Sequence, residues 1–180
     1  YRAMKRIMII GCGGAGKSTF SRKLNAITGI EVIHLDQYYW KPGWTASSKE
    51  EWEINVRELV KKSTWLMDGN YGGTMDLRLE HADTIIYLDY PSWKCLYRVT
   101  KRTFKYWNQE KPDNAPGCKE RFNFEFLVYV ANYNRTRRPK IYLKLDKLKM
   151  RKDVIIFKND QEADAFLRDI STKWTINSQL

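Results

Sequence analysis

Residues 7–18 read Ile7-Met8-Ile9-Ile10-Gly11-Cys12-Gly13-Gly14-Ala15-Gly16-Lys17-Ser18, and this stretch decides the fold. Its first four residues form an apolar run typical of a buried parallel strand. Residues 11–18 match G-x-x-x-x-G-K-[ST], a loop whose backbone N–H groups surround a phosphate ahead of a helix N-terminus. The segment from Ser18 to Thr28 is typical of a helix that ends at Gly29. A glycine-rich turn with a chance lysine is the alternative.

The motif assigns a role to its residues. Lys17 is expected to reach the β- and γ-phosphates of a nucleoside triphosphate, and the Ser18 hydroxyl to ligate Mg²⁺. Cys12 is expected to fill a variable position without a role of its own. ATP and Mg²⁺ are therefore the expected cofactors. The expected nucleotide-binding residues are Gly11, Gly13, Gly14, Ala15, Gly16, Lys17, Ser18 and Thr19.

Short β-like runs alternate with helical stretches along the rest of the chain. This alternation predicts a three-layer α/β/α fold with a five-stranded parallel sheet and a helical lid. The expected strands are Arg6–Ile10, Glu31–Leu35, Thr64–Asp68, Thr84–Leu88 and Val154–Phe157. The expected later helices run from a capping box at Ser47-Ser48 to about Lys62, from Pro91-Ser92 onward, from Lys119 to about Arg135, and, after a break at Pro139, from Lys140 to Met150.

The length of 180 residues predicts a single domain over residues 1–180. The formal net charge of +11 is uneven, since residues 94–152 hold 17 Lys+Arg and 5 Asp+Glu, and the remainder holds 15 and 16. This predicts an inserted basic lid region at about 94–150, suited to a nucleoside triphosphate, a phosphorylated substrate or nucleic acid. Solvated helix faces are the alternative for most of the lysines.

Cysteine usage and hydropathy bear on location. Three cysteines without C-x-x-C spacing and only two histidines indicate neither a disulfide framework nor a zinc site, which favours the cytoplasm. No apolar run is long enough to span a bilayer and no signal-peptide core precedes the first strand, so no membrane partner is expected. Met4 begins a stretch typical of a natural start, and residues 1–3 are expected to be an added leader.

Aspartates follow the expected strands, at the edge where ligands bind in parallel α/β sheets. Asp36 is a candidate to orient or deprotonate an acceptor hydroxyl, because phosphoryl transfer needs positioning and charge neutralisation more than a strong base. Asp68 is a candidate to hold Mg²⁺ through water. The alternatives are a loop cap at Asp36 and a tight turn after Asp68. Asp89 is expected to be structural and to bind backbone N–H groups near Pro91.

An aromatic loop and a glycine-rich turn are expected to receive the phosphoryl acceptor. Residues 37–44 carry four aromatic side chains, among which Trp40 and Trp44 are candidates to stack on a base or sugar ring. A lid packed on the core is the alternative. Asn70 and Tyr71 lie between glycines that allow a substrate to approach the backbone closely.

Arginines of the basic region are candidates to close over the phosphates. Arg98 and Arg102 are one helical turn apart and share a face, and Arg138 belongs to a cluster beside Pro139. Guanidinium groups on a mobile cap can neutralise a transferring phosphoryl group and exclude water. The expected catalytic set is Lys17, Asp36, Asp68, Arg98, Arg102 and Arg138.

The order of these motifs resembles that of the adenylate-kinase-like P-loop kinases over nearly the whole chain. The stretches His34-Leu35-Asp36, Asp68-Gly69-Asn70-Tyr71 and Arg138-Pro139-Lys140 also resemble the bacterial DNA topology modulation proteins. The resemblance implies a P-loop kinase with an unassigned acceptor. Adenylate kinases have Asp-Gly-Phe-Pro-Arg where this chain has Asp-Gly-Asn-Tyr-Gly, which argues against AMP as acceptor. Arg78 is expected to stand in for the missing arginine and to bind substrate.

Two functions from different classes follow. The first is a small-molecule kinase that transfers the γ-phosphate of ATP to a nucleoside, a nucleotide or another hydroxyl-bearing acceptor. The second is a nucleic-acid-binding regulatory ATPase. No helix-turn-helix, RNA-binding or zinc-finger pattern is present, which favours the kinase. No Asn-Lys-x-Asp follows the last strands, which argues against a GTPase. Nucleic acid is therefore expected to bind only non-specifically.

Overall fold

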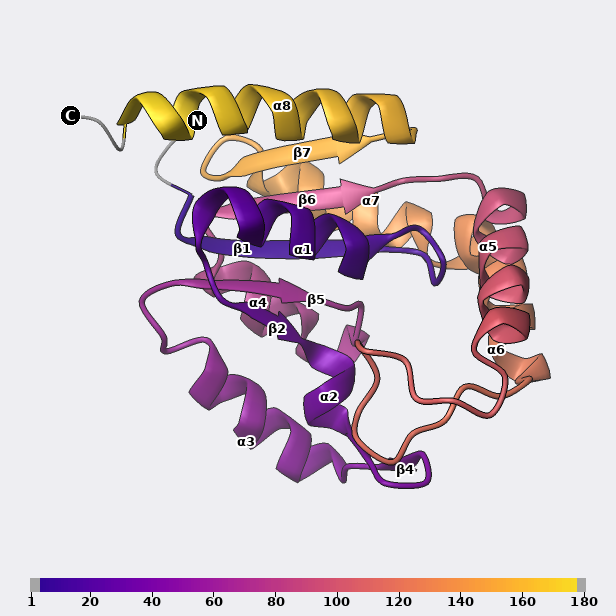
Figure 1. The fold of residues 1–180 in the computed structure, drawn as a ribbon. Helices are drawn as coiled ribbons and strands as arrows, with labels where there is room; N and C mark the ends of the chain where they lie inside the picture. Colours follow the sequence, from indigo (N-terminus) through magenta and orange to yellow (C-terminus); the bar gives the residue numbers. More distant parts are fainter. Residues whose placement is uncertain (1–3, 178–180) are drawn as a thin grey trace.

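A five-stranded parallel sheet forms the centre of the computed structural model, which describes residues 4–177 (Figure 1). The strand order is β2-β5-β1-β6-β7, and in the central strand Met8 pairs with Met67 on one side and Ile85 on the other. The predicted parallel sheet is confirmed. Its strands are β1 (Arg6–Gly11), β2 (Val32–His34), β5 (Trp65–Asp68), β6 (Thr84–Leu88) and β7 (Asp153–Phe157).

Helices cover both faces of the sheet. Figure 1 shows α1 in front of the sheet, with α4 and α7 behind it, and α1 packs along α8. The predicted three layers are therefore present. The helices are α1 (Lys17–Thr28), α2 (Leu35–Tyr39), α3 (Lys49–Leu59), α4 (Met75–His81), α5 (Ser92–Lys105), α6 (Phe124–Thr136), α7 (Arg138–Leu148) and α8 (Asp160–Asn177), with one 3₁₀ turn at Gly72–Thr74.

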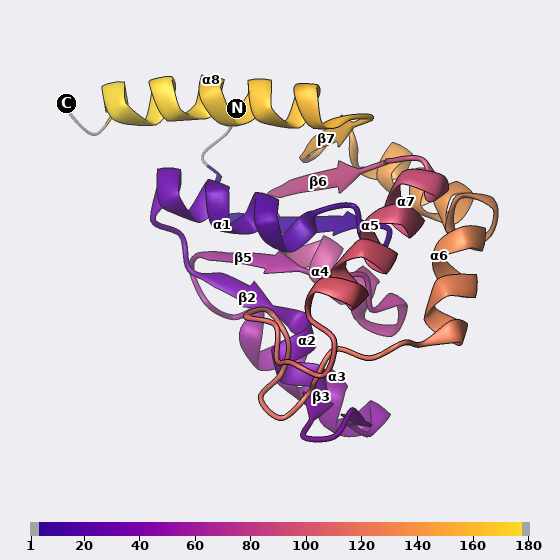
Figure 2. The same cartoon turned by 45° about the vertical axis from the view of Figure 1, so that its right-hand side comes forward.

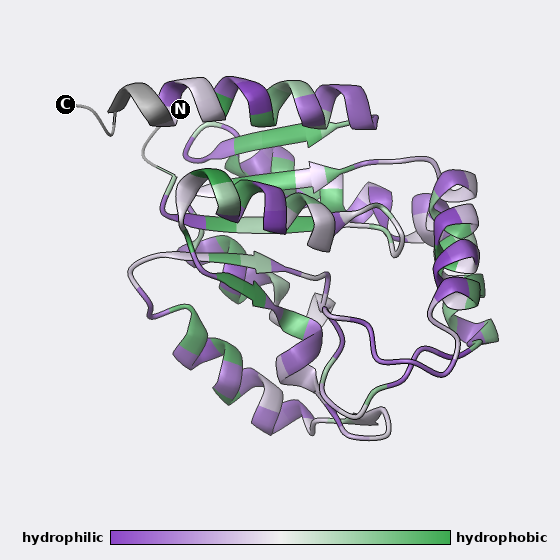
Figure 3. Cartoon of the chain, viewed as in Figure 1, coloured by the Kyte–Doolittle hydropathy of each residue, from purple (hydrophilic) through white to green (hydrophobic). Residues whose placement is uncertain are grey.

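The buried layer follows from the apolar runs of the sequence. Ile7, Ile9 and Ile10 in β1 are completely buried, as strands covered on both faces require. Figure 3 colours the strands largely as hydrophobic, whereas the helices alternate between hydrophobic and hydrophilic residues. This asymmetry directs one side of each helix toward the sheet and leaves the other side to water.

Local signals set most helix ends, with two corrections. The predicted capping box is present, since the Ser48 hydroxyl accepts a hydrogen bond from the Glu51 N–H at 3.2 Å. Helix α6 begins at Phe124 rather than Lys119, because the Asn123 side chain caps it through the Phe126 N–H at 3.0 Å. The break predicted at Pro139 lies at Arg137 instead, because Pro139 belongs to the first turn of α7, where its missing N–H has no helical partner to lose.

Several elements were missing from the sequence prediction. Helices α2, α4 and α8 are present, and a short antiparallel pair, β3 (Trp40–Lys41) with β4 (Thr45–Ala46), follows α2. The aromatic loop expected at residues 37–44 is thus a folded helix and hairpin. Residues 1–3, expected to be an added leader, lie outside the described residues. Within the described part of the chain, no helix is both long and apolar enough to cross a membrane.

Helices α5 and α6 stand across the carboxyl ends of the strands, where the arrowheads point in Figure 1. The connection between them, residues 106–123, reaches down to α2 and the β3–β4 hairpin, as the turned view of Figure 2 also shows. The Gly43 N–H donates to the Gly117 carbonyl at 3.0 Å and the Trp44 indole to the Lys119 carbonyl at 2.8 Å. The basic region thereby encloses the edge of the sheet that carries the phosphate loop.

Candidate active site

The phosphate loop connects β1 to α1 at the centre of this edge. Gly14 and Gly16 have φ angles of 81° and 94°, a region that favours glycine, and a Cβ on Gly14 would also collide with the Cys95 carbonyl. The Lys17 ammonium donates to the carbonyls of Gly11 (2.9 Å) and Cys12 (3.0 Å). Burial lowers the pKa of Lys17, although nearby Cys12, Asp68 and Asp36 oppose the shift. The half-buried Lys17 is thus held against its own loop, beside the space for a phosphate.

A cavity of about 930 Å³ opens at this edge of the sheet. Its size suits a nucleotide together with a small second ligand. It brings together most residues that the sequence nominated. Those on its wall are Gly13, Gly14, Ala15, Gly16, Lys17, Ser18, Thr19, Asp36, Trp40, Trp44, Asp68, Asn70, Tyr71, Arg98 and Arg102. Gly11, Arg78 and Arg138 are not among the wall residues.

Asp68 ends β5 beside the loop and is fixed by His34, a residue that sequence reasoning did not nominate. The distance from His34 Nδ1 to Asp68 Oδ2 is 2.7 Å, and His34 Nε2 lies 3.6 Å from Asp113 Oδ1. Burial disfavours the imidazolium, but Asp68 and Asp113 outweigh it and raise the pKa of His34. The available signals were the position of His34 at the end of an expected strand and its place in the His34-Leu35-Asp36 stretch, whereas the pairing of that strand with β5 is known from the structure.

The wall residues fit a magnesium ion in their chemistry. Mg²⁺ prefers oxygen ligands and usually retains several waters, binding through one or two protein groups and the substrate phosphates. The Ser18 hydroxyl and the Asp68 carboxylate both face the cavity beside the phosphate loop. Among the described residues no group of three or more His, Cys, Asp or Glu forms a cage of metal ligands. A site shared with phosphate oxygens is therefore the kind that these residues suit.

Asp36 and Tyr71 form the second polar feature of the cavity. The Tyr71 hydroxyl donates a hydrogen bond to Asp36 Oδ1, and burial together with that carboxylate raises the pKa of Tyr71. The Tyr71 ring packs between those of Tyr39 (4.8 Å between centroids) and Trp52 (4.9 Å). Asp36 is thus held by a neutral donor whose ring is anchored in the core.

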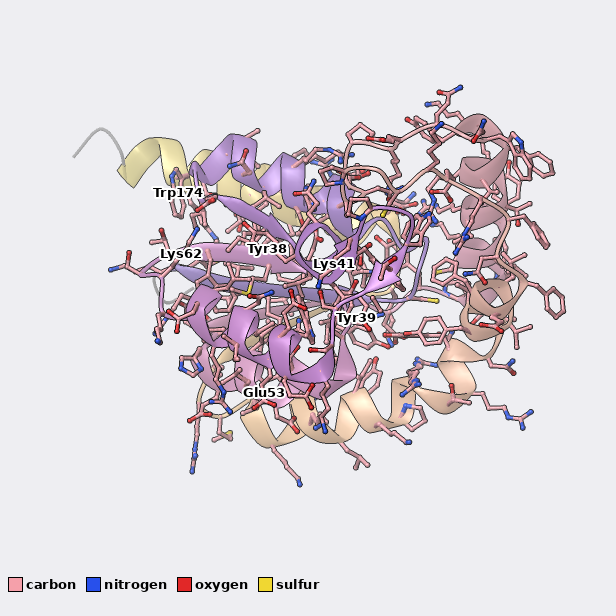
Figure 4. The ribbon with its side chains drawn as sticks, turned by 90° about the horizontal axis from the view of Figure 1, so that it is seen from below. Tyr38, Tyr39, Lys41, Glu53, Lys62 and Trp174 are labelled. Carbon is pink, nitrogen blue, oxygen red and sulfur yellow. The ribbon has the colours of Figure 1, made fainter. Side chains whose placement is uncertain are left out.

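Trp40 and Trp44 form an aromatic wall beside Asp36. Their rings meet edge to face at a centroid distance of 5.5 Å, and Trp40 is also 4.9 Å from Tyr39. Figure 4 views this side of the molecule from below, with Tyr39 and Lys41 marking the segment that carries both tryptophans. The predicted aromatic segment therefore does face the cavity, and it also packs partly on the core.

Asn70 lines the cavity, but its amide is engaged in structure. It donates to the Gly11 carbonyl at 2.7 Å and accepts from the Gly11 N–H at 3.1 Å. Both polar ends of the side chain therefore brace the start of the phosphate loop. The structure thus gives Asn70 a bracing role, and its contact with substrate stays a prediction.

Arg78 does not line the cavity and its donors are taken up by backbone carbonyls, which argues against the predicted substrate contact. The side chain is completely buried and donates to the carbonyls of Gly69 (3.0 Å), Asn70 and Tyr71 (3.0 Å). Its position in α4 directs the guanidinium under the turn that follows β5. Arg78 thus satisfies the carbonyls of that turn and holds the backbone that carries Asn70 and Tyr71.

Arg98 and Arg102 line the cavity from α5, whereas Arg138 does not reach it. Arg138 contacts the buried carboxylate of Asp89 at 2.9 Å. Lys158 and the Tyr142 hydroxyl contact the same carboxylate. Burial opposes ionisation of Asp89, but these neighbours prevail and lower its pKa. A catalytic role for Arg138 thus stays a prediction that this geometry does not support, and Asp89 is held by side-chain partners rather than by backbone N–H groups.

Comparisons with known proteins identify the fold. No protein-family model and no curated protein matches the chain. It is similar to the shikimate kinase from Acinetobacter baumannii in complex with shikimate, at 16% identity and a TM-score of 0.56, over 97% of this chain and 95% of that one. It is also similar to the shikimate kinase from Bacteroides thetaiotaomicron, at 15% identity and 0.55, over 99% and 100%. The predicted three-layer α/β/α fold of P-loop kinases is thereby confirmed.

Proposed function

We propose that this protein is an adenylate-kinase-like phosphotransferase that moves the γ-phosphate of ATP to a hydroxyl group of a small molecule. One observation carries the proposal: the phosphate loop, Asp68 and Asp36 share the wall of a single cavity at the carboxyl edge of the sheet. A loop of this kind binds a triphosphate, and Asp36 supplies a carboxylate for the acceptor. The fold similarity to two shikimate kinases is in keeping with this function.

Different residues bind ATP and the phosphoryl acceptor. The backbone N–H groups of residues 13–18 hold the phosphates, and Lys17 neutralises charge on them. The acceptor hydroxyl oxygen bonds to the γ-phosphorus while the bond from that phosphorus to the bridging oxygen breaks, so that ADP leaves. Asp36 orients the hydroxyl and takes its proton, which then passes to water. Arg98 is the wall arginine assigned to the transferring phosphoryl group.

Magnesium is the expected partner of the triphosphate. Ser18 would ligate the ion directly and Asp68 would hold it through water, with His34 fixing the carboxylate. When bound, the ion neutralises charge on the phosphate oxygens. We further propose a cytoplasmic enzyme, in line with its three free cysteines.

The loop assignment is tested by replacing Lys17 with Ala. We expect ATP turnover to be lost while the variant folds normally, because the lysine charge is needed only when phosphate is present. Lys61→Ala is the matched control, since that lysine is exposed and its one ion pair within residues 4–177 is with Glu58, one turn away. ATP consumption is measured over a panel of hydroxyl-bearing acceptors, together with the far-UV spectrum of each variant. Normal turnover by a folded Lys17→Ala protein would refute the proposal.

The net positive charge of the basic region suggests a second candidate function, a nucleic-acid-binding regulatory ATPase. The resemblance to DNA topology modulation proteins suggests the same function. We expect weak binding of DNA that falls steeply with salt, as for any protein of this charge. We also expect no effect of DNA on ATP turnover. A strong rise in the ATPase rate with DNA concentration at near-physiological salt would favour the regulatory ATPase over the kinase.

A further inference from the structure

The cations around the cavity differ in whether they can leave their present partners. Asp113, in the connection between α5 and α6, is only 5% exposed. It contacts Arg22 of α1, and Lys111 at 3.3 Å. Burial opposes ionisation of Asp113, but Arg22 and Lys111, with His34, lower its pKa. A carboxylate with so little exposure would be poorly solvated if it lost its cations, so Arg22 and Lys111 are held in place.

Arg102 is engaged in the same way. Its Nη2 lies 3.2 Å from Glu120 Oε1, and Glu120 is 5% exposed. The same carboxylate oxygen accepts a hydrogen bond from the Thr103 hydroxyl at 3.2 Å. Release of Arg102 toward a ligand would therefore leave a buried charge with one neutral donor. Arg102 is thus better suited to holding the connection against α5 than to binding phosphate, which revises its expected catalytic role.

Arg98 has a different environment. Its partner Asp160, at 2.7 Å, has a side chain that is 46% exposed and is also contacted by Lys94 at 2.6 Å. If Arg98 moves to a phosphate, water and Lys94 still solvate the carboxylate. Arg98 is thus free to exchange partners at little cost, as a group that follows the phosphates of ATP must be.

Asp36 and the aromatic wall lie on the side of the cavity to which the connection docks. The Gln37 amide donates to the Pro112 carbonyl at 3.2 Å, so residues 111–113 lie next to α2 and Asp36. Within residues 4–177, Asp36 makes no ion pair, and its partner is the neutral Tyr71 hydroxyl. Lys111, which precedes Pro112 in the connection, is held by Asp113. The acceptor side thus offers a carboxylate and indole rings, but no releasable pair of cations.

Arg121 is the wall arginine for which the described residues show no ion pair. It lies two residues before the N-cap of α6, and the Phe126 ring of that helix packs against Gly13 in the phosphate loop. We therefore count Arg121 with the nucleotide phosphates. Arg121 is also a single exposed guanidinium, so it could not supply the charge that the cations paired with Asp113 and Glu120 withhold from an acceptor.

We propose that the acceptor is an uncharged ring compound with a free hydroxyl group, of which nucleosides are the favoured class, and that it carries no phosphate or carboxylate of its own. The proposal deepens and rests on the proposed kinase function. Indole rings at Trp40 and Trp44 stack on a planar base or on the face of a sugar. Asp36 receives the hydroxyl. An acceptor with its own phosphate or carboxylate would bring negative charge next to the carboxylates of the cavity. The cations that could neutralise this charge are already paired with Asp113 and Glu120.

Matched substrate pairs test the proposal. We would measure kcat/KM with ATP for each common nucleoside and its 5′-monophosphate, for ribose and ribose 5-phosphate, and for shikimate as an acid. We expect at least one neutral member to be used ten-fold or more better than its phosphorylated partner, with the ribose pair separating sugar from nucleoside recognition. Equal or better use of the phosphorylated member, use of shikimate alone, or use of no neutral compound would overturn the proposal. The kinase function is judged separately, by Lys17-dependent ATP consumption with any acceptor.

The charge argument itself is tested with Asp113→Asn and Glu120→Gln. Each releases cations, so we expect the affinity for a nucleoside monophosphate relative to its nucleoside to rise at least three-fold, followed by tryptophan fluorescence. Two variants are used so that a folding failure in one leaves the other. Asp160→Asn is the control, since it releases Arg98 and should change the affinity for ATP without changing the acceptor ratio. An unchanged ratio in the folded Asp113 or Glu120 variant would overturn the proposal.

Discussion

Replacement of Arg78 by Met separates a structural from a substrate-binding role. The guanidinium is completely buried and donates to the carbonyls of Gly69, Asn70 and Tyr71. Methionine keeps much of the length and packing of the side chain but has no donor. The carbonyls of Gly69 and Asn70 would therefore lose the donor that Arg78 provides, whereas the Tyr71 carbonyl would keep the Thr74 N–H at 3.1 Å. The turn that carries Tyr71 would lose much of its support.

The size of the effect follows from those contacts. A buried polar group that loses its partner costs about 1–3 kcal/mol, and costs within one shared network overlap rather than add. Removal of a buried charge, whose desolvation already lowers the pKa of Arg78, returns part of this cost. We expect a net loss of about 2–4 kcal/mol. In a domain of this size the melting temperature then falls by roughly 4–16 °C.

Thermal and urea unfolding of Arg78→Met provide the measurement. Arg57→Met is the control, because Arg57 is largely exposed and, in the described part of the chain, its one ion pair is with Glu53 on the same helix, so its loss should cost less than about 0.5 kcal/mol. Arg78→Lys should fall between, since one ammonium cannot reach all three carbonyls in the fork geometry of a guanidinium. If Arg78→Met is as stable as the control and only the KM for the acceptor rises, Arg78 serves substrate and the structural argument is wrong.

Three further predictions concern the other parts of the site. Asp36→Asn should lower acceptor-dependent turnover by about 10²–10⁴-fold with little change in ATP affinity, because the carboxylate serves the acceptor; a fall in ATP affinity with unchanged saturated turnover would place Asp36 with the nucleotide. Residues 108–117 should exchange backbone hydrogen more slowly with a bound ATP analogue, as expected if the basic lid region moves over the triphosphate; equal exchange at saturation would indicate a rigid surface. Asp89 has a lowered pKa in the folded protein, so its ion pairs stabilise the fold above the unfolded pKa of about 4 and are lost as the pH falls through the folded value. The stability difference between wild type and Asp89→Asn, from urea unfolding, should therefore shrink below about pH 4, and a constant difference down to pH 2 would contradict the ion-pair assignment.

The strands and the phosphate loop could be predicted from the sequence because their signals are local. The residues of the loop are contiguous, and the apolar runs beside them fall within one residue of the observed strand ends. The identity of the cavity edge also followed, since every parallel strand carries its next loop to the same side. Helices α4 and α8 were missed although their residues pack on the sheet, because their amphipathic pattern was not separated from the neighbouring loops.

The long-range partners of the charged residues were decided by the tertiary structure. Arg22 meets Asp113 across 91 positions, and Arg138 meets Asp89 across 49. The sequence alone does not distinguish an arginine that contacts a ligand, as proposed for Arg98, from one that contacts a backbone turn, as Arg78 does. The difference is burial, because a guanidinium removed from water must be satisfied within the protein. Which arginines are buried depends on how the helices pack, so the sequence determined the phosphate site while packing determined which charges remain free to serve it.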